Sequence, residues 1–301
     1  MKRIAFLERH HHLLRRMHSL TGVLPIGLFL IIHLTTNSSI VWGAINAEKG
    51  ANAVERGVAT FQKEVYFIHN LPFLILTEIF VLWLPILFHS VLGFYYATTG
   101  HSNVARYGWG GNWRYSLQRI SGYVAFLFIL YHVGTLRWGW TFLVPGGADW
   151  SHHFAASTMA QALRGSTEGI TIGGALVSAF YFLGVTAAVY HFANGLWTWA
   201  ITWGLTVSQK AQQRWGAVCA GLGVALMAMA YSAVMGFLTL DPNQARAVEM
   251  KMLPADVAAE MGIDQRERPG IEAGHADRPI TPLEPAGDTA PTTPPVVTPD
   301  Q

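Results

Sequence analysis

The sequence predicts an all-α membrane protein, a bundle of five transmembrane helices followed by a disordered C-terminal tail. Two observations carry this prediction. Of the 301 residues, 51% are hydrophobic and only 13% are charged, whereas soluble domains carry about 25% charged residues. A helix needs about 20 mainly apolar residues to cross a bilayer. Five stretches meet that length, at residues 20–42, 71–98, 117–144, 170–203 and 215–240.

The five stretches divide the chain into three parts. Residues 1–19 form a basic segment in which five Lys or Arg residues face a single acid, Glu8. Residues 20–240 form the membrane domain. Residues 241–301 hold ten of the 14 prolines, and a segment so poor in apolar residues cannot bury a core. We therefore expect a disordered tail, with a short helix around 245–261 as an alternative.

The charges predict the orientation of the chain, because cytoplasmic loops are enriched in Lys and Arg. The N-terminus, the segment 99–119 and the loop 204–214 together carry ten Lys or Arg residues and one acid. The opposite loops carry five Lys or Arg residues and several acids. We expect a cytoplasmic N-terminus in a bacterial inner membrane. Five spans then place the C-terminal tail outside.

The first four spans each contain one central histidine: His33, His89, His132 and His191. With a helical rise of about 1.5 Å per residue, His33 and His132 lie about 20 and 22 Å from the cytoplasmic ends of their spans. On the same basis, His89 and His191 lie about 10 and 15 Å from those ends. The depths predict an outer pair, His33 with His132, and an inner pair, His89 with His191.

Two imidazoles on different helices are what a six-coordinate haem b requires, and such an iron transfers electrons. The single cysteine, Cys219, excludes an internal disulfide and covalent haem attachment through C-x-x-C-H. Zinc is a weaker alternative, because its sites need three or four converging ligands. The purely structural alternative is that each histidine only packs in the bundle and forms a hydrogen bond to a neighbouring helix. Glycine follows each inner histidine by one turn, at Gly93 and Gly195, and leaves room for a porphyrin.

Other polar residues are candidates for contacts with cofactor and substrate. Glu78 lies in the outer half of the second span, where an acid is costly and usually functional. It is either a proton-exchanging group at a quinone site or a hydrogen-bonded structural acid. On the cytoplasmic side we expect four polar residues to bind haem propionates: Arg16, His18, Ser19 and Arg119. The alternative is that these side chains only extend to the membrane surface, as long polar side chains commonly do.

Residues 14–240 resemble the single-chain, five-helix, two-haem cytochrome b anchor of succinate dehydrogenase and fumarate reductase (complex II). The segments that carry the resemblance are RRMHSLTGVLPIGLFLIIHLTTN, LPFLILTEIFVLWLPILFHSVLGFYY, NWRYSLQRISGYVAFLFILYHV and YHFANGLWTWAITWGLTV. The tail has no counterpart in that family pattern. The family's ligand pattern falls on His33 and His132 for the distal haem and on His89 and His191 for the proximal haem.

The resemblance implies a membrane subunit that binds no dicarboxylate itself. It implies partner subunits, a flavoprotein with FAD and an iron–sulfur protein, and a membrane quinone, more often menaquinone, as electron acceptor. Three alternatives remain open: the same subunit in a quinol:fumarate reductase, the haem b subunit of another membrane dehydrogenase or of a bc-type complex, and a transporter or structural anchor with packing histidines. Histidines on four helices disfavour the bc type, which pairs them on two.

Overall fold

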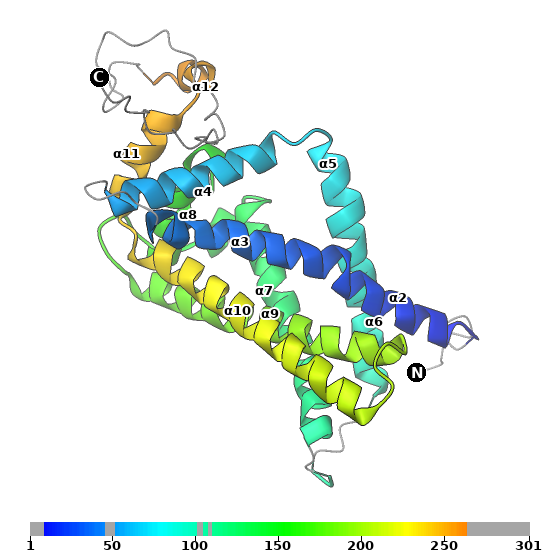
Figure 1. The fold of residues 1–301 in the computed structure, drawn as a ribbon. Coiled ribbons are helices and arrows are strands. Elements are labelled where there is room, and N and C mark those ends of the chain that lie inside the picture. The colour runs from blue at the N-terminus through cyan, green and yellow to red at the C-terminus, as the bar shows by residue number, and fades with distance from the viewer. Residues whose placement is uncertain (1–8, 46–51, 101–104, 108–109, 264–301) are drawn as a thin grey trace, which may run out of the picture.

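A computed structural model describes residues 9–45, 52–100, 105–107 and 110–263, and the regular structure within these ranges is helical (Figure 1). It contains five helices long and apolar enough to cross a membrane, which confirms the five predicted spans. The first span comprises α2 (His11–Val23) and α3 (Pro25–Ile45). The other four spans are Leu74–Thr99, Asn112–Leu136, Ile172–Thr202 and Gln209–Thr239.

The second span changes its helical type in the middle. It begins with α5 (Leu74–Thr77), continues as a six-residue π-helix, η1 (Glu78–Trp83), and ends as α6 (Leu84–Thr99). Pro85 lies two residues after the end of η1 and has no N–H to donate, which loosens the hydrogen bonding of the preceding turn. π-Helical segments are rare and are frequent at functional sites, and here the segment begins at Glu78.

The core of the bundle lies between α3, α9 (Ile172–Thr202) and α10 (Gln209–Thr239), while α7 (Gly110–Leu136) packs along α9. The second span packs mainly on α2, through α6, and makes fewer contacts with α3 and α7. Leu92 is its one buried residue. The space between this span, α3, α7 and α9 is lined by side chains and forms the cavity described below.

The third span ends at Leu136, earlier than the expected residue 144. Gly139 adopts a positive φ of 68° there, and short 3₁₀ turns follow. The segment 145–169, between the third and fourth predicted spans, contains a regular helix, α8. The elements of this region are η2 (Thr141–Leu143), η3 (Pro145–Gly147), η4 (His152–Phe154) and α8 (Ala155–Arg164).

Helices outside the membrane spans form a cap over the end of the bundle opposite the N-terminus (Figure 1). The cap consists of α4 (Ala53–His69), η4, α8 and α11 (Pro242–Met252). Gln62 of α4 donates to the His152 carbonyl at 2.7 Å. Glu249 of α11 accepts hydrogen bonds from the backbone N–H groups of Ala156 and Ser157, at 2.7 and 3.1 Å. Two fully buried polar side chains thus hold the start of α8.

The cap includes the beginning of the segment expected to be a disordered tail. Residues 242–260 form α11 and α12 (Ala255–Glu260), and Ala245, Glu249 and Ala258 are fully buried. The expected short helix is therefore present as two. The remainder of the predicted tail, residues 264–301, and the first eight residues of the basic segment lie outside the described residues.

Candidate functional site

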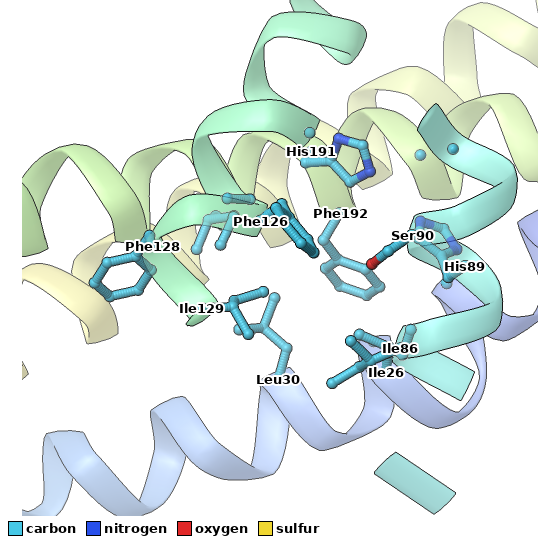
Figure 2. Close-up of a pocket in the computed structure, with 18 of the residues that line it drawn as sticks. Ile26, Leu30, Ile86, His89, Ser90, Phe126, Phe128, Ile129, His191 and Phe192 are labelled. Carbon is cyan, nitrogen blue, oxygen red and sulfur yellow. The ribbon is translucent and has the colours of Figure 1, made fainter. Parts of the chain in front are cut away.

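A cavity of about 1070 Å³ runs between the helices of the bundle, and all four span histidines line it. Figure 2 shows His89 and His191 projecting from α6 and α9 beside the apolar side chains of Phe126 and Phe192. Farther along the cavity the lining is again apolar, with Leu30 and Ile129 from facing helices. The bundle thus encloses a long apolar space with imidazoles at two levels.

The inner pair is held by backbone carbonyls of neighbouring helices. The ring centroids of His89 and His191 lie 6.0 Å apart with an interplanar angle of 84°. His89 Nδ1 donates to the carbonyl of His18 on α2 at 2.9 Å, and His191 Nδ1 donates to the carbonyl of Gln118 on α7 at 3.0 Å. Because a carbonyl only accepts, each ring carries its proton on Nδ1, and Nε2 keeps a free lone pair.

The outer pair is held by side chains. The centroids of His33 and His132 lie 5.7 Å apart with an interplanar angle of 83°. His132 Nδ1 lies 3.3 Å from the hydroxyl of Tyr181, and His33 Nε2 lies 3.4 Å from the amide nitrogen of Asn37. Phe29 stacks on the His33 ring with centroids 5.2 Å apart.

Both pairs have the spacing of two axial ligands of one metal. A metal–imidazole nitrogen bond is about 2 Å, so two imidazoles on opposite sides of one ion have centroids about 6 Å apart. Within the described residues, His, Cys, Asp and Glu form no group of three or more able to hold a metal ion. The two nitrogen donors of each pair therefore fit a metal whose remaining ligands come from a planar cofactor. The cavity that both pairs line leaves space for such a cofactor.

The glycines expected to leave room for the cofactor line the cavity, but their nearest neighbours are polar side chains. A Cβ built on Gly93 would lie 3.4 Å from His18 Cε1, and one built on Gly195 would lie 3.4 Å from Gln118 Nε2. The tighter approaches to the inner imidazoles come from Gly22 and Gly122, on the neighbouring helices. Sequence reasoning missed them, because it looked for glycine on the ligand's own helix.

The polar residues expected near the cytoplasmic end are only partly brought together. His18, Ser19 and Arg119 line the cavity, whereas Arg16 does not and lies over the Trp203 ring at 5.3 Å. The His18 ring stacks on His89 with centroids 4.0 Å apart. The lining also contains two arginines that sequence reasoning did not select as site residues, Arg15 and Arg114.

Glu78 forms an ion pair with Arg137 at 3.0 Å, where the side chains are 23% and 54% exposed. Neither residue lines the cavity, but the stacked Trp83 and Trp138, with centroids 5.7 Å apart, do. The ion pair explains how an acid is tolerated at this position of the second span.

Three further histidines gather near this ion pair at the cap. The rings of His69 and His152 stack at 4.4 Å, and His153 adjoins His152 at 3.8 Å. Burial and then the charge of Arg137 lower the pKa of His69, and burial followed by its two histidine neighbours lowers the pKa of His152 to about 4. These rings are therefore neutral near pH 7.

Fold and cavity together define a multi-pass helical membrane protein with a large, mostly apolar cavity between its spans. The chain is 33% identical, over 224 residues, to the succinate dehydrogenase cytochrome b558 subunit of Bacillus subtilis (strain 168); the alignment covers 74% of this chain and 96% of that protein. The chain belongs to the family of succinate dehydrogenase cytochrome b membrane subunits. No family model matches the chain, and no solved structure matches it.

Proposed function

We propose that this chain is the membrane-anchor, di-haem cytochrome b subunit of a succinate:quinone oxidoreductase. In this proposal it passes electrons from an iron–sulfur subunit to a membrane quinone through an inner, proximal haem b and an outer, distal one. The observation that carries the proposal is the presence of two imidazole pairs at two levels of one cavity, with centroids 6.0 and 5.7 Å apart. The relative, a succinate dehydrogenase cytochrome b, supports haem as the bound group.

The proposed axial ligands are His89 and His191 for the proximal haem, and His33 and His132 for the distal haem. Haem b with both axial positions filled supplies one-electron transfer without a site for oxygen. The residues of this chain orient the imidazoles: backbone carbonyls fix the inner pair, and Tyr181 contacts the outer pair. Metal-binding histidines usually donate their second ring nitrogen in this way.

The polar end of the cavity is the proposed position of the proximal propionates. His18, Ser19 and Arg119 are the partners favoured by their place in the lining. Arg16, which packs on Trp203, is proposed to act at the edge of this site. Gly93 and Gly195 remain the proposed sites of close porphyrin approach.

The proposed quinone site lies at the outer end of the cavity, with menaquinone as the acceptor. Glu78 is the proposed proton-exchanging group, since it begins a π-helix and adjoins the Trp83–Trp138 stack that lines the cavity. Arg137 is its ion-pair partner, with Arg137 Nη2 3.0 Å from Glu78 Oε2. The reverse reaction, quinol:fumarate reduction, uses the same residues and remains the second candidate.

The proposed partners are a flavoprotein with FAD and an iron–sulfur protein, bound at the cytoplasmic face. The basic residues of the N-terminus and of the loops beside it support a cytoplasmic N-terminus in a bacterial inner membrane. The cap formed by α4, η4, α8 and α11 then lies outside, and so does the Pro-rich segment 241–301, which contributes α11 to the cap. Co-purification of the chain with a flavoprotein and an iron–sulfur protein tests this assembly.

Replacement of single histidines tests the ligand pairs. In complexes purified from membranes, a redox titration of the b-type haem absorbance should show one step for each haem. His33→Ala or His132→Ala should remove the step of the outer haem and keep that of the inner haem. His89→Ala or His191→Ala should do the reverse. His153→Ala, in the cap, is the control and should keep both steps. A wild-type chain without any b-type absorbance would refute the proposal, and loss of both steps from every variant would refute the pairing.

Glu78→Gln tests the quinone site separately from the haems. We expect both redox steps to remain and the reduction of an artificial dye by succinate to persist. Succinate:quinone activity should fall by about 100-fold or more, since a positioned proton-transfer group contributes about 10²–10⁴-fold. Glu55→Gln, an exposed cap acid paired with Lys251, is the matched control. Full quinone activity in Glu78→Gln would leave Glu78 a structural acid.

A further inference from the structure

The inner pair is built from two helix pairs that share one packing arrangement. In the first, between α2 and α6, the His89 ring lies directly against Gly22. A Cβ placed on Gly22 would lie 2.6 Å from His89 Cε1 and 3.0 Å from Nδ1. The same ring donates from Nδ1 to the carbonyl of His18, one turn before Gly22 on the same helix.

The second pair, between α7 and α9, repeats this arrangement. A Cβ placed on Gly122 would lie 2.9 Å from His191 Cε1 and 3.3 Å from Nδ1. The His191 ring donates from Nδ1 to the carbonyl of Gln118, again one turn before the glycine. The segments HSLTG and QRISG share this spacing of carbonyl and glycine, although their other residues differ.

The arrangement is reciprocal within each pair. On α6, the glycine one turn after His89 faces the His18 ring, and on α9 the glycine one turn after His191 faces the Gln118 side chain. Each helix therefore contributes a polar residue and, four positions later, a glycine that accepts the polar side chain of its neighbour. The α2–α6 pair and the α7–α9 pair therefore accommodate a histidine side chain in the same way.

A physical reason connects the glycine with the hydrogen bond. An imidazole reaches a carbonyl of a neighbouring helix only if no side chain stands between the ring and that helix. Real Cβ atoms essentially never lie within 3.0 Å of another heavy atom, because close-packed interiors leave no such overlap. A methyl group at residue 22 or 122 would push the ring outward and weaken the bond that fixes its orientation.

We propose that Gly22 and Gly122 are positioning residues of the inner haem, which let the carbonyls of His18 and Gln118 lock the two axial imidazoles nearly perpendicular to each other. This inference rests on the proposed function, since it takes His89 and His191 as ligands. It is selective, because no glycine in the described part of the chain makes such an approach to His33 or His132. The outer haem is the internal reference.

The test uses Gly22→Ala and Gly122→Ala in the complete complex purified from membranes. The measurements are a redox titration of the haem absorbance and the electron paramagnetic resonance spectrum of the oxidised haems, which responds to the orientation of the axial imidazoles. We expect the inner step to shift or disappear and the inner-haem resonance to move, with the outer signals unchanged. The effect should be larger for Gly22→Ala, because its overlap is greater.

Two glycines away from the histidines provide matched controls. A Cβ on Gly236 would lie 2.8 Å from Ile40 Cγ2, so Gly236→Ala introduces a similar overlap into helix packing alone, while Gly221 has nothing within 4 Å. Both controls should keep the inner signals. If Gly22→Ala lowers the amount of complex in the membrane, Gly122→Ala, which introduces a smaller overlap, still tests the inference. The ratio of the inner-haem signal to the outer-haem signal does not depend on the amount of complex.

Unchanged inner signals in both variants, or an equal shift in Gly236→Ala, would overturn the inference. Either result would leave the proposed function intact, as long as the wild-type complex shows two redox steps. A wild-type complex without two steps would instead refute the di-haem proposal itself. The two failures are therefore distinguishable in one set of measurements.

Discussion

The hydroxyl of Tyr181 offers a direct means of changing the proposed outer haem without removing a proposed ligand. Tyr181 lies on α9, is 4% exposed, and its oxygen lies 3.3 Å from His132 Nδ1. If His132 binds iron through Nε2, its Nδ1–H donates to this oxygen and makes the ligand a stronger electron donor. A stronger donor stabilises oxidised iron. Tyr181→Phe should therefore raise the midpoint potential of the outer haem.

The size of the shift follows from the geometry. A neutral hydrogen bond contributes about 0.5–1.5 kcal/mol, and a separation of 3.3 Å is at the long end of the usual range, which favours the lower half. About 0.5–1 kcal/mol, expressed wholly as a difference between the two oxidation states, corresponds to about 20–40 mV for a one-electron couple.

A redox titration of the haem absorbance in the purified complex measures this shift. Tyr231→Phe is the matched control, because Tyr231 bonds to the Thr186 hydroxyl at 2.7 Å, and neither residue lines the cavity that the four histidines share. It should leave both midpoints unchanged. A lowered outer midpoint in Tyr181→Phe, or a shift confined to the inner haem, would refute the reasoning.

Two predictions concern the cap. Glu249→Ala removes the acceptor of two backbone N–H groups and should destabilise α8 by about 2 kcal/mol. Faster exchange of the amide hydrogens of α8 measures this loss. Equal acceleration in Glu55→Ala, an exposed control, would contradict the prediction. Burial lowers the pKa of His152 from 6.5 to about 4, so its stabilising contribution is present above pH 6.5 and is lost as the pH falls toward 4. The thermal midpoint should fall less on acidification in His152→Gln than in wild type, and an equal fall would exclude His152.

Hydropathy alone was sufficient to predict the five spans, because a continuous apolar surface is required wherever a helix meets lipid. Apart from the short helix expected around residues 245–261, the cap was not predicted, since its helices are short and its decisive contacts join distant parts of the chain. Gln62 and Glu249 read as ordinary surface residues, yet each bonds to a backbone group about 90 positions away. The π-helix also escaped prediction, because hydropathy does not distinguish one helical hydrogen-bonding pattern from another.

Depth along a helix predicted which histidines would be neighbours, and the rings of His89 and His191, like those of His33 and His132, do adjoin. Depth could not predict what orients each ring. For the inner pair the partner is a carbonyl, which every residue type possesses and which therefore leaves no mark in the sequence. The only trace in the sequence is the glycine that leaves the carbonyl accessible, and this glycine lies on a different helix from the histidine.

The two pairs therefore differ in how evolution or mutation could adjust them. Substituting His18 or Gln118 leaves its backbone carbonyl in place, so the orientation of the inner imidazoles resists most single changes except those at Gly22 and Gly122. In the outer pair, His132 has a side-chain partner, the Tyr181 hydroxyl, which a single substitution removes. The backbone fixes the orientation of the inner imidazoles, whereas a replaceable side chain contacts the outer pair.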